Sequence, residues 1–126
     1  MPPTIYEQIG PEGFERLVRA FYQRVAVDPV LRPMYPEHDL EGAELRLRLF
    51  LIQFFGGPTT YSDQRGHPRL RMRHSPFRID EDARNVWIRH MLAALDEVQI
   101  PEPARSDMQT YFERTATGLI NTFFPT

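Results

Sequence analysis

The fold of this chain is decided by a stretch in its middle, Gly66-His67-Pro68-Arg69-Leu70-Arg71-Met72-Arg73-His74. Glycine and proline at the start of this stretch interrupt regular structure, and Pro76 interrupts it again just after the end. The residues in between are therefore predicted to form one short, arginine-rich helix that ends near His74. By position alone, His74 is an ordinary helix-end histidine, whose charged form is favourable at the negative end of the helix dipole.

Two helices are predicted at the start of the chain. Thr4 and Glu7 have the spacing of a capping box and open a short helix that ends at Gly10-Pro11. A longer amphipathic helix follows in residues 13–25, because apolar residues recur there at spacings of three and four. Its apolar positions are Phe14, Leu17, Val18, Phe21, Tyr22 and Val25.

A short helix and a long one are predicted next. Asp28-Pro29 supplies an N-cap followed by proline at the first helical position, and Pro33 and Pro36 end the short helix. Residues 40–55 form a helix that is apolar on several sides and is therefore expected to be buried on several sides. Gly56-Gly57-Pro58 stops it, and a polar loop leads to the central stretch. Apolar residues on one face are Ala43, Leu47, Phe50, Leu51 and Phe54, and those on other faces are Leu45, Leu49 and Ile52.

Two further long helices are predicted after Pro76. Asp80 is a good N-cap for the first helix, a turn at Ile100-Pro101 ends it, and the second continues to Phe123. Their apolar positions are Ala83, Val86, Trp87, Met91, Ala94, Leu95 and Val98, then Met108, Phe112, Thr115, Ala116, Leu119, Ile120 and Phe123. No stretch alternates with the two-residue period of a strand. The fold class is therefore all-α, with four substantial helices and several short ones in a single domain, residues 1–126.

The composition excludes several classes of protein. Hydrophobic residues make up 41% of the chain, and the net charge of −2 gives no attraction to nucleic acid or anionic lipid. No cysteine is present, which removes disulfides, thiolate metal sites and cysteine nucleophiles together. We find no leader peptide and no apolar run of about 18 residues, so we expect a cytoplasmic protein without membrane insertion. Glycine-rich phosphate loops and the common hydrolase motifs are also absent.

The four histidines do not form a local metal site. They are His38, His67, His74 and His90, and none lies one helical turn from another. One histidine nevertheless suffices when a porphyrin supplies four nitrogens, because haem iron then needs only an axial residue from the protein.

The central stretch resembles the characteristic motif of the truncated haemoglobins. It follows Gln53-Phe54-Phe55-Gly56-Gly57-Pro58 and Tyr61-Ser62, as in that family. The resemblance covers essentially the whole chain and extends to Phe21-Tyr22, Met34-Tyr35-Pro36 and Trp87. A tryptophan at that position is similar to what the second group of the family shows.

This resemblance implies a shortened globin, a two-over-two helical sandwich around haem b (iron protoporphyrin IX). His74 corresponds to the proximal ligand of the haem iron. Tyr22, Tyr35 and Trp87 correspond to the residues that line the distal side. Ala43 and Leu47 face the haem from the long middle helix, and Ala43 stands where some relatives place histidine or glutamine.

Further residues are implied to hold the haem itself. The propionates need cations or hydroxyls at the mouth of the pocket, for which the candidates are Arg46, Tyr61, His67 and Arg69. The candidates for the apolar wall are Phe50, Phe54, Leu70, Phe77 and Met91, although each could serve the protein core equally well. The Leu70 carbonyl lies four residues before His74 and is a candidate acceptor for the second imidazole nitrogen.

Two functions follow from this set of residues. The first is reversible binding of dioxygen or another small diatomic ligand, held by tyrosine and indole donors in a dry pocket. The second is a haem-based redox enzyme, a nitric oxide dioxygenase or a peroxidase-like protein. Such an enzyme needs an external reductase, because the chain has no reductase domain of its own. The sequence does not decide between binding protein and enzyme, or between monomer and homodimer.

Overall fold

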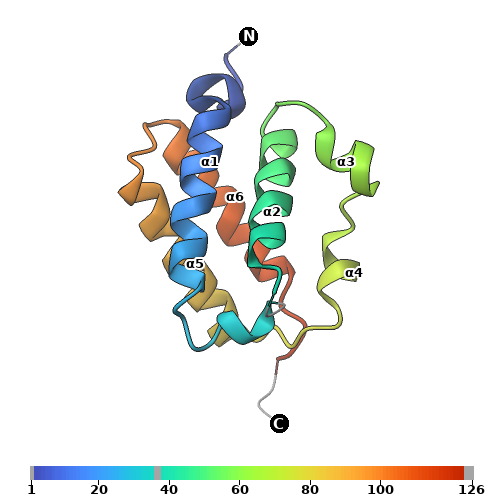
Figure 1. Cartoon of the computed structure of the whole chain (residues 1–126). Coiled ribbons are helices and arrows are strands. Elements are labelled where there is room, and N and C mark those ends of the chain that lie inside the picture. Colours follow the sequence, from blue (N-terminus) through green and yellow to red (C-terminus); the bar gives the residue numbers. More distant parts are fainter. Residues whose placement is uncertain (1, 36–37, 124–126) are drawn as a thin grey trace.

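The computed structural model describes residues 2–35 and 38–123, and within them every regular element is helical. The long helices are α1 (Ile5–Val25), α2 (Leu40–Phe54), α5 (Glu81–Glu97) and α6 (Ala104–Gly118); the short ones are the 3₁₀ helix η1 (Arg32–Met34), α3 (Thr60–Arg65) and α4 (Leu70–His74). Helices α1 and α2 lie in front of α5 and α6, while α3 and α4 flank α2 (Figure 1). The predicted all-α, two-over-two class is therefore confirmed.

The capping box at the start of α1 is present as the sequence predicts. The Glu7 N–H donates to the Thr4 hydroxyl and the Thr4 N–H donates to the Glu7 carboxylate, both at 3.0 Å. The two predicted helices are joined into one element by a kink, at which Gly10 has φ 70° and ψ 170°. Such backbone angles suit glycine, which has no Cβ to clash, so the kink falls where the sequence breaks the pattern.

The connection from α1 to α2 is held by Asp28. Its carboxylate accepts from the N–H groups of Val30 at 2.8 Å and Leu31 at 2.9 Å. The predicted short helix is formed only as η1, and Leu31 anchors it to the core with 2% of its surface exposed. Pro36, which the sequence gives as the end of this helix, lies outside the described residues.

Helix α2 ends at the predicted glycines. Gly56 takes φ 102°, and the Gly57 N–H donates to the Ile52 carbonyl at 2.8 Å, which satisfies one of the last carbonyls of the helix. Helix α2 buries Ala43, Phe50, Leu51 and Ile52, which include residues of different faces as expected, while Leu45 and Phe54 are 44% and 52% exposed.

The predicted polar loop between α2 and the central stretch contains helix α3. The Gln53 side chain donates to the Ser62 hydroxyl at 2.8 Å and accepts from the Ser62 N–H at 2.9 Å. This helix is held to α2 by polar side-chain bonds and by the buried Tyr61, so it has no apolar periodicity by which the sequence could have revealed it.

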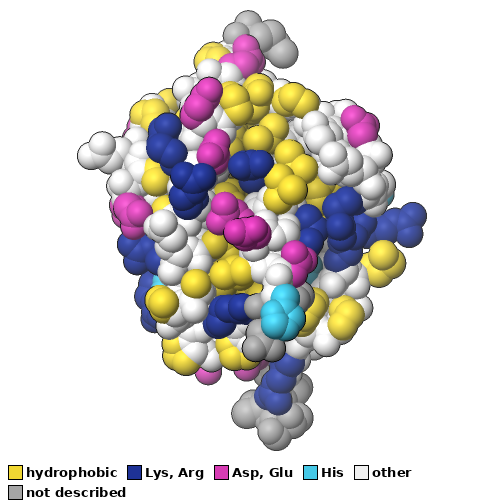
Figure 2. Space-filling view, viewed as in Figure 1, with side chains coloured by type: hydrophobic (Ala, Val, Ile, Leu, Met, Phe, Trp, Pro, Cys, Tyr) yellow, Lys and Arg dark blue, Asp and Glu magenta, His cyan; other side chains and the backbone are white. Residues whose placement is uncertain are grey.

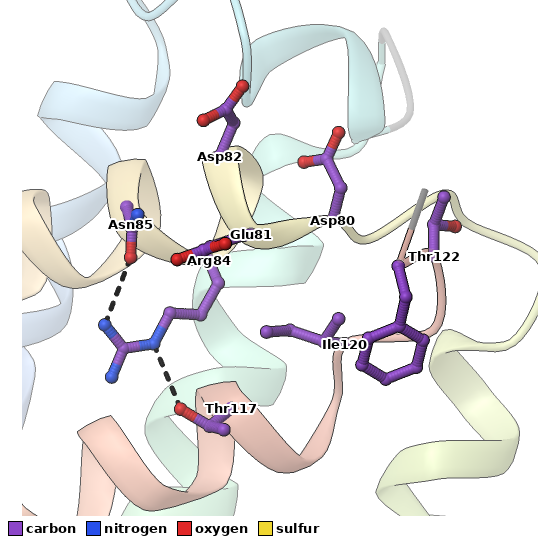
Figure 3. A pocket seen from close by; sticks show the side chains of 9 residues that line it. Asp80, Glu81, Asp82, Arg84, Asn85, Thr117, Ile120 and Thr122 are labelled. Atoms are coloured by element: carbon purple, nitrogen blue, oxygen red, sulfur yellow. Dashed lines mark hydrogen bonds between the residues drawn. The ribbon is translucent and has the colours of Figure 1, made fainter. Parts of the chain in front are cut away.

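Helices α5 and α6 are tied together beside their ends. The Asp80 side chain caps α5 as predicted, accepting from the Ala83 N–H at 2.8 Å. Arg84 donates to the Thr117 hydroxyl at 3.2 Å (Figure 3), and it also donates to the Glu113 carbonyl at 3.2 Å. Helix α6 ends at Gly118 instead of continuing to Phe123.

The chain beyond α6 pairs with the segment before α5. The Ile79 N–H donates to the Asn121 side chain at 2.8 Å, and the Asn121 N–H donates back to the Ile79 carbonyl at 2.9 Å. This pairing replaces the last predicted helical turn and leaves Phe123 76% exposed.

The core lies where the two helix pairs cross. It is built on fully buried side chains of α1, α5 and α6, the largest of which include Phe14, Phe21, Met91, Met108 and Phe112. Among the described residues, no helix is both long and apolar enough to cross a membrane.

Candidate functional site

A cavity of about 520 Å³ opens among α1, α2, the α3–α4 segment, α5 and α6. Its volume lies within the usual range for small-molecule and cofactor sites, roughly 300–1,000 Å³. Its walls are mainly apolar and aromatic. The residues expected from the sequence that line it are Tyr22, Tyr35, Ala43, Arg46, Leu47, Phe50, Tyr61, Leu70, His74, Phe77 and Trp87.

His74 reaches the cavity from the end of α4 with its ring held in one tautomer. Its Nδ1 lies 2.7 Å from the Leu70 carbonyl oxygen, the acceptor that the sequence suggested. Because a carbonyl can only accept, Nδ1 carries the proton and donates it. Nε2 is then the unprotonated nitrogen, with a lone pair available to a metal.

Arg73 fastens the segment that carries this histidine. Its Nε donates to the Pro68 carbonyl at 2.7 Å and its Nη2 donates to the Arg65 carbonyl at 2.9 Å. The guanidinium carbon also lies 6.0 Å from the centre of the Tyr61 ring, within the range of a cation–π contact. One side chain thereby connects the end of α3, the turn before α4 and the wall of the cavity.

Three aromatic side chains with polar ends come from three different elements. Tyr22 comes from α1, Tyr35 directly follows η1, and Trp87 comes from the first half of α5. The Tyr22 and Tyr35 rings meet edge to face with centroids 5.6 Å apart, and the ring of Phe21 lies 4.9 Å from that of Trp87. The fold therefore brings the predicted distal set together.

The hydroxyl groups in this set are strongly desolvated. Burial raises the pKa of Tyr22 well above its ordinary value of 10.0, and the neighbouring Tyr35 raises it further. Burial also raises the pKa of Tyr35, while hydrogen bonds from Tyr22 and Trp87 act in the opposite direction. Both phenols consequently stay protonated at neutral pH and can act as hydrogen-bond donors.

Tyr22 and Trp87 both lower the pKa of Tyr35 through their side-chain polar groups, so we assign the Tyr35 oxygen as the acceptor shared by the two. An indole N–H can only donate, which fixes the direction of the contact from Trp87. A phenol oxygen has two lone pairs and one proton, so accepting twice leaves the proton to be donated. Within residues 2–35 and 38–123, no protein acceptor takes that proton.

Charged groups are few in the cavity wall and come from arginine. Arg46 of α2 lines the cavity and pairs with Asp39, its Nη1 lying 3.0 Å from the carboxylate. Arg65, Arg73 and Arg84 also reach the wall. Residues 64–79 contain five arginines and no acidic residue. Basic side chains accordingly gather on the side of the molecule where α3 and α4 lie (Figure 2).

Four of the residues expected around the cavity lie outside its lining. Met91 is fully buried in the core, and Phe54 is half exposed, with its ring 4.0 Å from that of Tyr111. Arg69 and His67 are exposed in the turn before α4, where the His67 ring accepts from the Arg69 N–H at 3.1 Å. The apolar periodicity gave the correct helix face for Met91 but could not show which neighbour that face meets.

Several lining residues were missed at the sequence level. Five of them come from α6 and its end, where an apolar face was predicted without a role in the cavity: Tyr111, Phe112, Thr115, Ala116 and Leu119. The remaining ones are Leu31, Met34, Leu51, Arg65, Arg73, Ile79, Ala83 and Arg84.

A second hollow, of about 480 Å³, lies outside this cavity at the beginning of α5. Figure 3 shows acidic side chains around it, with Arg84 bonded to Asn85 and Thr117. Arg84 is part of the wall of both spaces. Neither here nor at any other place does the described part of the chain hold a group of three or more histidine, cysteine or acidic side chains that could bind a metal ion.

The arrangement fits a porphyrin with one protein ligand. The cavity is large and mainly apolar, and one imidazole presents an unprotonated nitrogen to it. Arginine side chains in the wall can pair with the propionate carboxylates of a porphyrin. Two crossed pairs of helices around such a cavity define a globin.

Comparison with known proteins identifies the kind of globin. The model of the bacterial-like globin family matches residues 4–121. Group 2 truncated hemoglobin YjbI of Bacillus subtilis is 39% identical over 116 residues, covering 92% of this chain and 87% of the relative. This chain belongs to the truncated haemoglobin family, in its second group. Membership implies a haem cofactor and small diatomic ligands.

Solved structures agree with this assignment. The hemoglobin of the thermophilic bacterium Chloroflexus aurantiacus has 56% identity and a TM-score of 0.93, covering 96% of this chain and all of its own. A truncated oxygen-avid haemoglobin from Bacillus subtilis has 38% identity and a TM-score of 0.90, covering 94% of this chain and 100% of its own.

Proposed function

We propose that this chain retains dioxygen on haem b, with His74 as the protein ligand to the iron and Tyr35 as the principal donor to the dioxygen. The observation that carries the proposal is the pairing of His74 Nδ1 with the Leu70 carbonyl, which leaves Nε2 free at the cavity wall. When bound, haem supplies an iron centre that takes up dioxygen and other diatomic molecules reversibly.

His74 is suited to the role of ligand by what surrounds it. A histidine ligand usually donates its second N–H to a carbonyl or carboxylate, which fixes the tautomer and the orientation of the ring. The Leu70 carbonyl does this from within the same helical turn. The Arg73 bonds to Pro68 and Arg65 hold that turn in place.

The distal residues are suited to hold a polarised ligand. Dioxygen gains negative charge when it binds to ferrous iron, and hydrogen bonds to a charged acceptor contribute about 1.5–3 kcal/mol. Tyr35 has the one proton in the set that is not already directed at another of its members. Tyr22 and Trp87 polarise that donor by hydrogen bonding to its oxygen. Ala43 has only a methyl group, which leaves room beside them.

The haem propionates would meet arginine at the mouth of the cavity. Arg46 and Arg73 both line it, and both are already held by other groups, which reduces the entropy lost on binding a carboxylate. Tyr61 supplies a hydroxyl on the same side. Arg69 and His67 are exposed beside α4 and remain candidates only for the outer end of a propionate.

Retention suits this donor set better than bulk delivery, because strong donors slow ligand release. The relative that is described as oxygen-avid supports the same conclusion. A haem-based redox enzyme is the second candidate, because Tyr22, Tyr35, Tyr61, Tyr111 and Trp87 all line one cavity and are oxidisable side chains. It requires an external reductase to return the iron to the ferrous state.

The proposal is tested by absorption spectra of the purified chain, recorded before and after reduction under carbon monoxide. We expect a Soret band that shifts to the position typical of a histidine-ligated carbonyl form. In His74→Ala this spectrum should be lost or changed, and in Met72→Ala, which alters an exposed side chain of the same helix, it should be retained. A wild-type chain that takes up no haem even after reconstitution would refute the proposal. Production of nitrate from nitric oxide, with a reductant present, would favour the enzyme instead.

A further inference from the structure

Asp28 is a buried carboxylate that the proposed function does not use. It is 7% exposed and is the single charged side chain counted as buried in the described part of the chain. Its Oδ1 accepts from the N–H groups of Val30 and Leu31. Its Oδ2 lies 2.7 Å from Nε2 of His90, which is 62 residues away in the sequence. Both carboxylate oxygens therefore have hydrogen-bond partners, which offsets the cost of burying a charge.

His90 is the partner that makes this pair specific. Its side chain is 13% exposed, and it lies in α5 one turn after Trp87. Hydrogen bonding from His90 is the main cause that lowers the pKa of Asp28, so the carboxylate is ionised at neutral pH. Arg89 Nη2 lies 3.7 Å from Oδ2 of Asp28, but the Arg89 side chain is 68% exposed, so solvent screens this interaction and it stabilises the carboxylate only weakly.

The Asp28 backbone holds the turn that leads to Tyr35. The Arg32 N–H donates to the Asp28 carbonyl at 3.0 Å, and the Tyr35 N–H donates to the Arg32 carbonyl at 3.2 Å. The Arg32 side chain also donates to the Tyr35 carbonyl at 3.3 Å. Asp28 therefore organises the segment that ends at Tyr35 through its backbone and through its side chain. The same carboxylate is bonded to the helix that carries Trp87.

We infer that the Asp28–His90 pair is a positioning device for the distal donors, which sets the Tyr35 hydroxyl against the Trp87 indole. This inference rests on the proposed function, because it concerns how the ligand-holding group is kept in place. Neither residue lines the cavity, so both act through others. The physical reason is that Tyr35 follows a short 3₁₀ turn with little stiffness of its own. Its distance from α5 is fixed by the buried Asp28–His90 hydrogen bond that connects the two segments.

The test uses four variants of the full-length chain. His90→Phe keeps a flat ring but removes the bond to Asp28. The double variant His90→Phe/Arg89→Gln does the same and also prevents Arg89 from replacing the lost bond. His90→Gln places an amide N–H where Nε2 lies and should restore the bond. Leu95→Ala is the matched control, since it removes a fully buried side chain of α5 two turns beyond Trp87. It destabilises the fold without touching the pair.

The first measurement follows the indole N–H of Trp87, which is the one tryptophan of the chain. Its hydrogen exchange is recorded by NMR in the haem-free chain and in the diamagnetic carbonyl form. We expect exchange to accelerate roughly fivefold to tenfold in His90→Phe, as for the loss of about one net hydrogen bond. His90→Gln should return to within about twofold of wild type. An exchange rate in His90→Phe that equals that of Leu95→Ala overturns the inference.

The second measurement is the stretching frequency of carbon monoxide in the reduced, haem-loaded protein. We expect the band to shift or split in His90→Phe, to recover in His90→Gln and to stay unchanged in Leu95→Ala. An unchanged band in His90→Phe would show that the donors are positioned without the pair, while the proposed function would stand. Failure of wild type to bind haem would remove the proposed function, and the indole exchange would still report whether the pair positions Trp87.

Discussion

Replacing Tyr35 by phenylalanine is the sharpest test of the distal arrangement. The substitution keeps the ring and its edge-to-face contact with Tyr22, whose centroid lies 5.6 Å away. It removes the oxygen atom that we assign as the shared hydrogen-bond acceptor of Tyr22 and Trp87. It also removes the proton that we assign to the ligand. One atom is therefore expected to affect both stability and ligand release.

The two effects have different magnitudes. Losing a hydrogen bond to a ligand that carries partial charge costs about 1.5–3 kcal/mol, which corresponds to a dioxygen release roughly 10 to 150 times faster. Losing the two internal hydrogen bonds should lower the free energy of unfolding by about 2 kcal/mol, at about 1 kcal/mol for each bond. Tyr22→Phe removes only one internal bond, so we expect about half of that loss and a much smaller acceleration of release.

The assay is stopped-flow displacement of dioxygen by carbon monoxide, combined with urea unfolding of the same proteins. The double variant Tyr22→Phe/Tyr35→Phe completes a cycle, and residues in direct contact are expected to couple by about 0.5–3 kcal/mol. The ratio of the dioxygen release rates of Tyr35→Phe and Tyr22→Phe shows which tyrosine is the principal donor. If Tyr22→Phe accelerates release as much as Tyr35→Phe does, Tyr35 is not the principal donor and the assignment is wrong.

Three further predictions concern stability. The pKa of Tyr22 is raised in the folded chain, so its protonated hydroxyl is fully compatible with the fold below pH 10.0. Above that pH the free energy of unfolding should fall by about 1.4 kcal/mol per pH unit for each such tyrosine. The urea midpoint of Tyr22→Phe should therefore fall less steeply with alkaline pH than that of wild type. The lowered pKa of Asp28 gives the opposite sign, so the difference in urea midpoint between wild type and Asp28→Asn should narrow as pH falls below 3.8. Gly56→Ala should destabilise the chain by about 1–3 kcal/mol, because φ is 102° and a Cβ would approach Thr4 to 2.7 Å. Thermal melts of this variant are compared with those of Gly118→Ala. The Cβ added at Gly118 would meet nothing within 4 Å, so that substitution should be neutral or slightly stabilising.

Most of the helices could be predicted because their ends carry side-chain chemistry. The capping box of Thr4 and Glu7, the Asp80 cap and the glycines after α2 all act within a few residues of themselves. Local interactions of this kind are visible in a sequence. The end of α6 could not be predicted, because it is set by the pairing of Asn121 with a segment 42 residues earlier.

The candidate site shows the same division. His74 and its carbonyl partner lie four residues apart, so their bond followed from the helix alone. The contribution of α6 to the cavity wall depends on how two helix pairs cross, which no local pattern encodes. Asp28 was recognised as a helix cap, but its second bond to His90 joins distant segments and needed the fold to reveal it.

The short helix that carries His74 has a consequence for how the cofactor is exchanged. Helix α4 has only five residues, none of which is buried, and it is held by side-chain hydrogen bonds of Arg71, Arg73 and Asn121. Segments with few buried contacts open locally at low free-energy cost, while core helices open only with global unfolding. With His74 as the proposed iron ligand, we expect haem to enter and leave through local opening of α4, whereas Tyr22, Tyr35 and Trp87 lie against helices of the core. The rate of haem loss and the rate of ligand release should therefore be set by two different parts of the molecule.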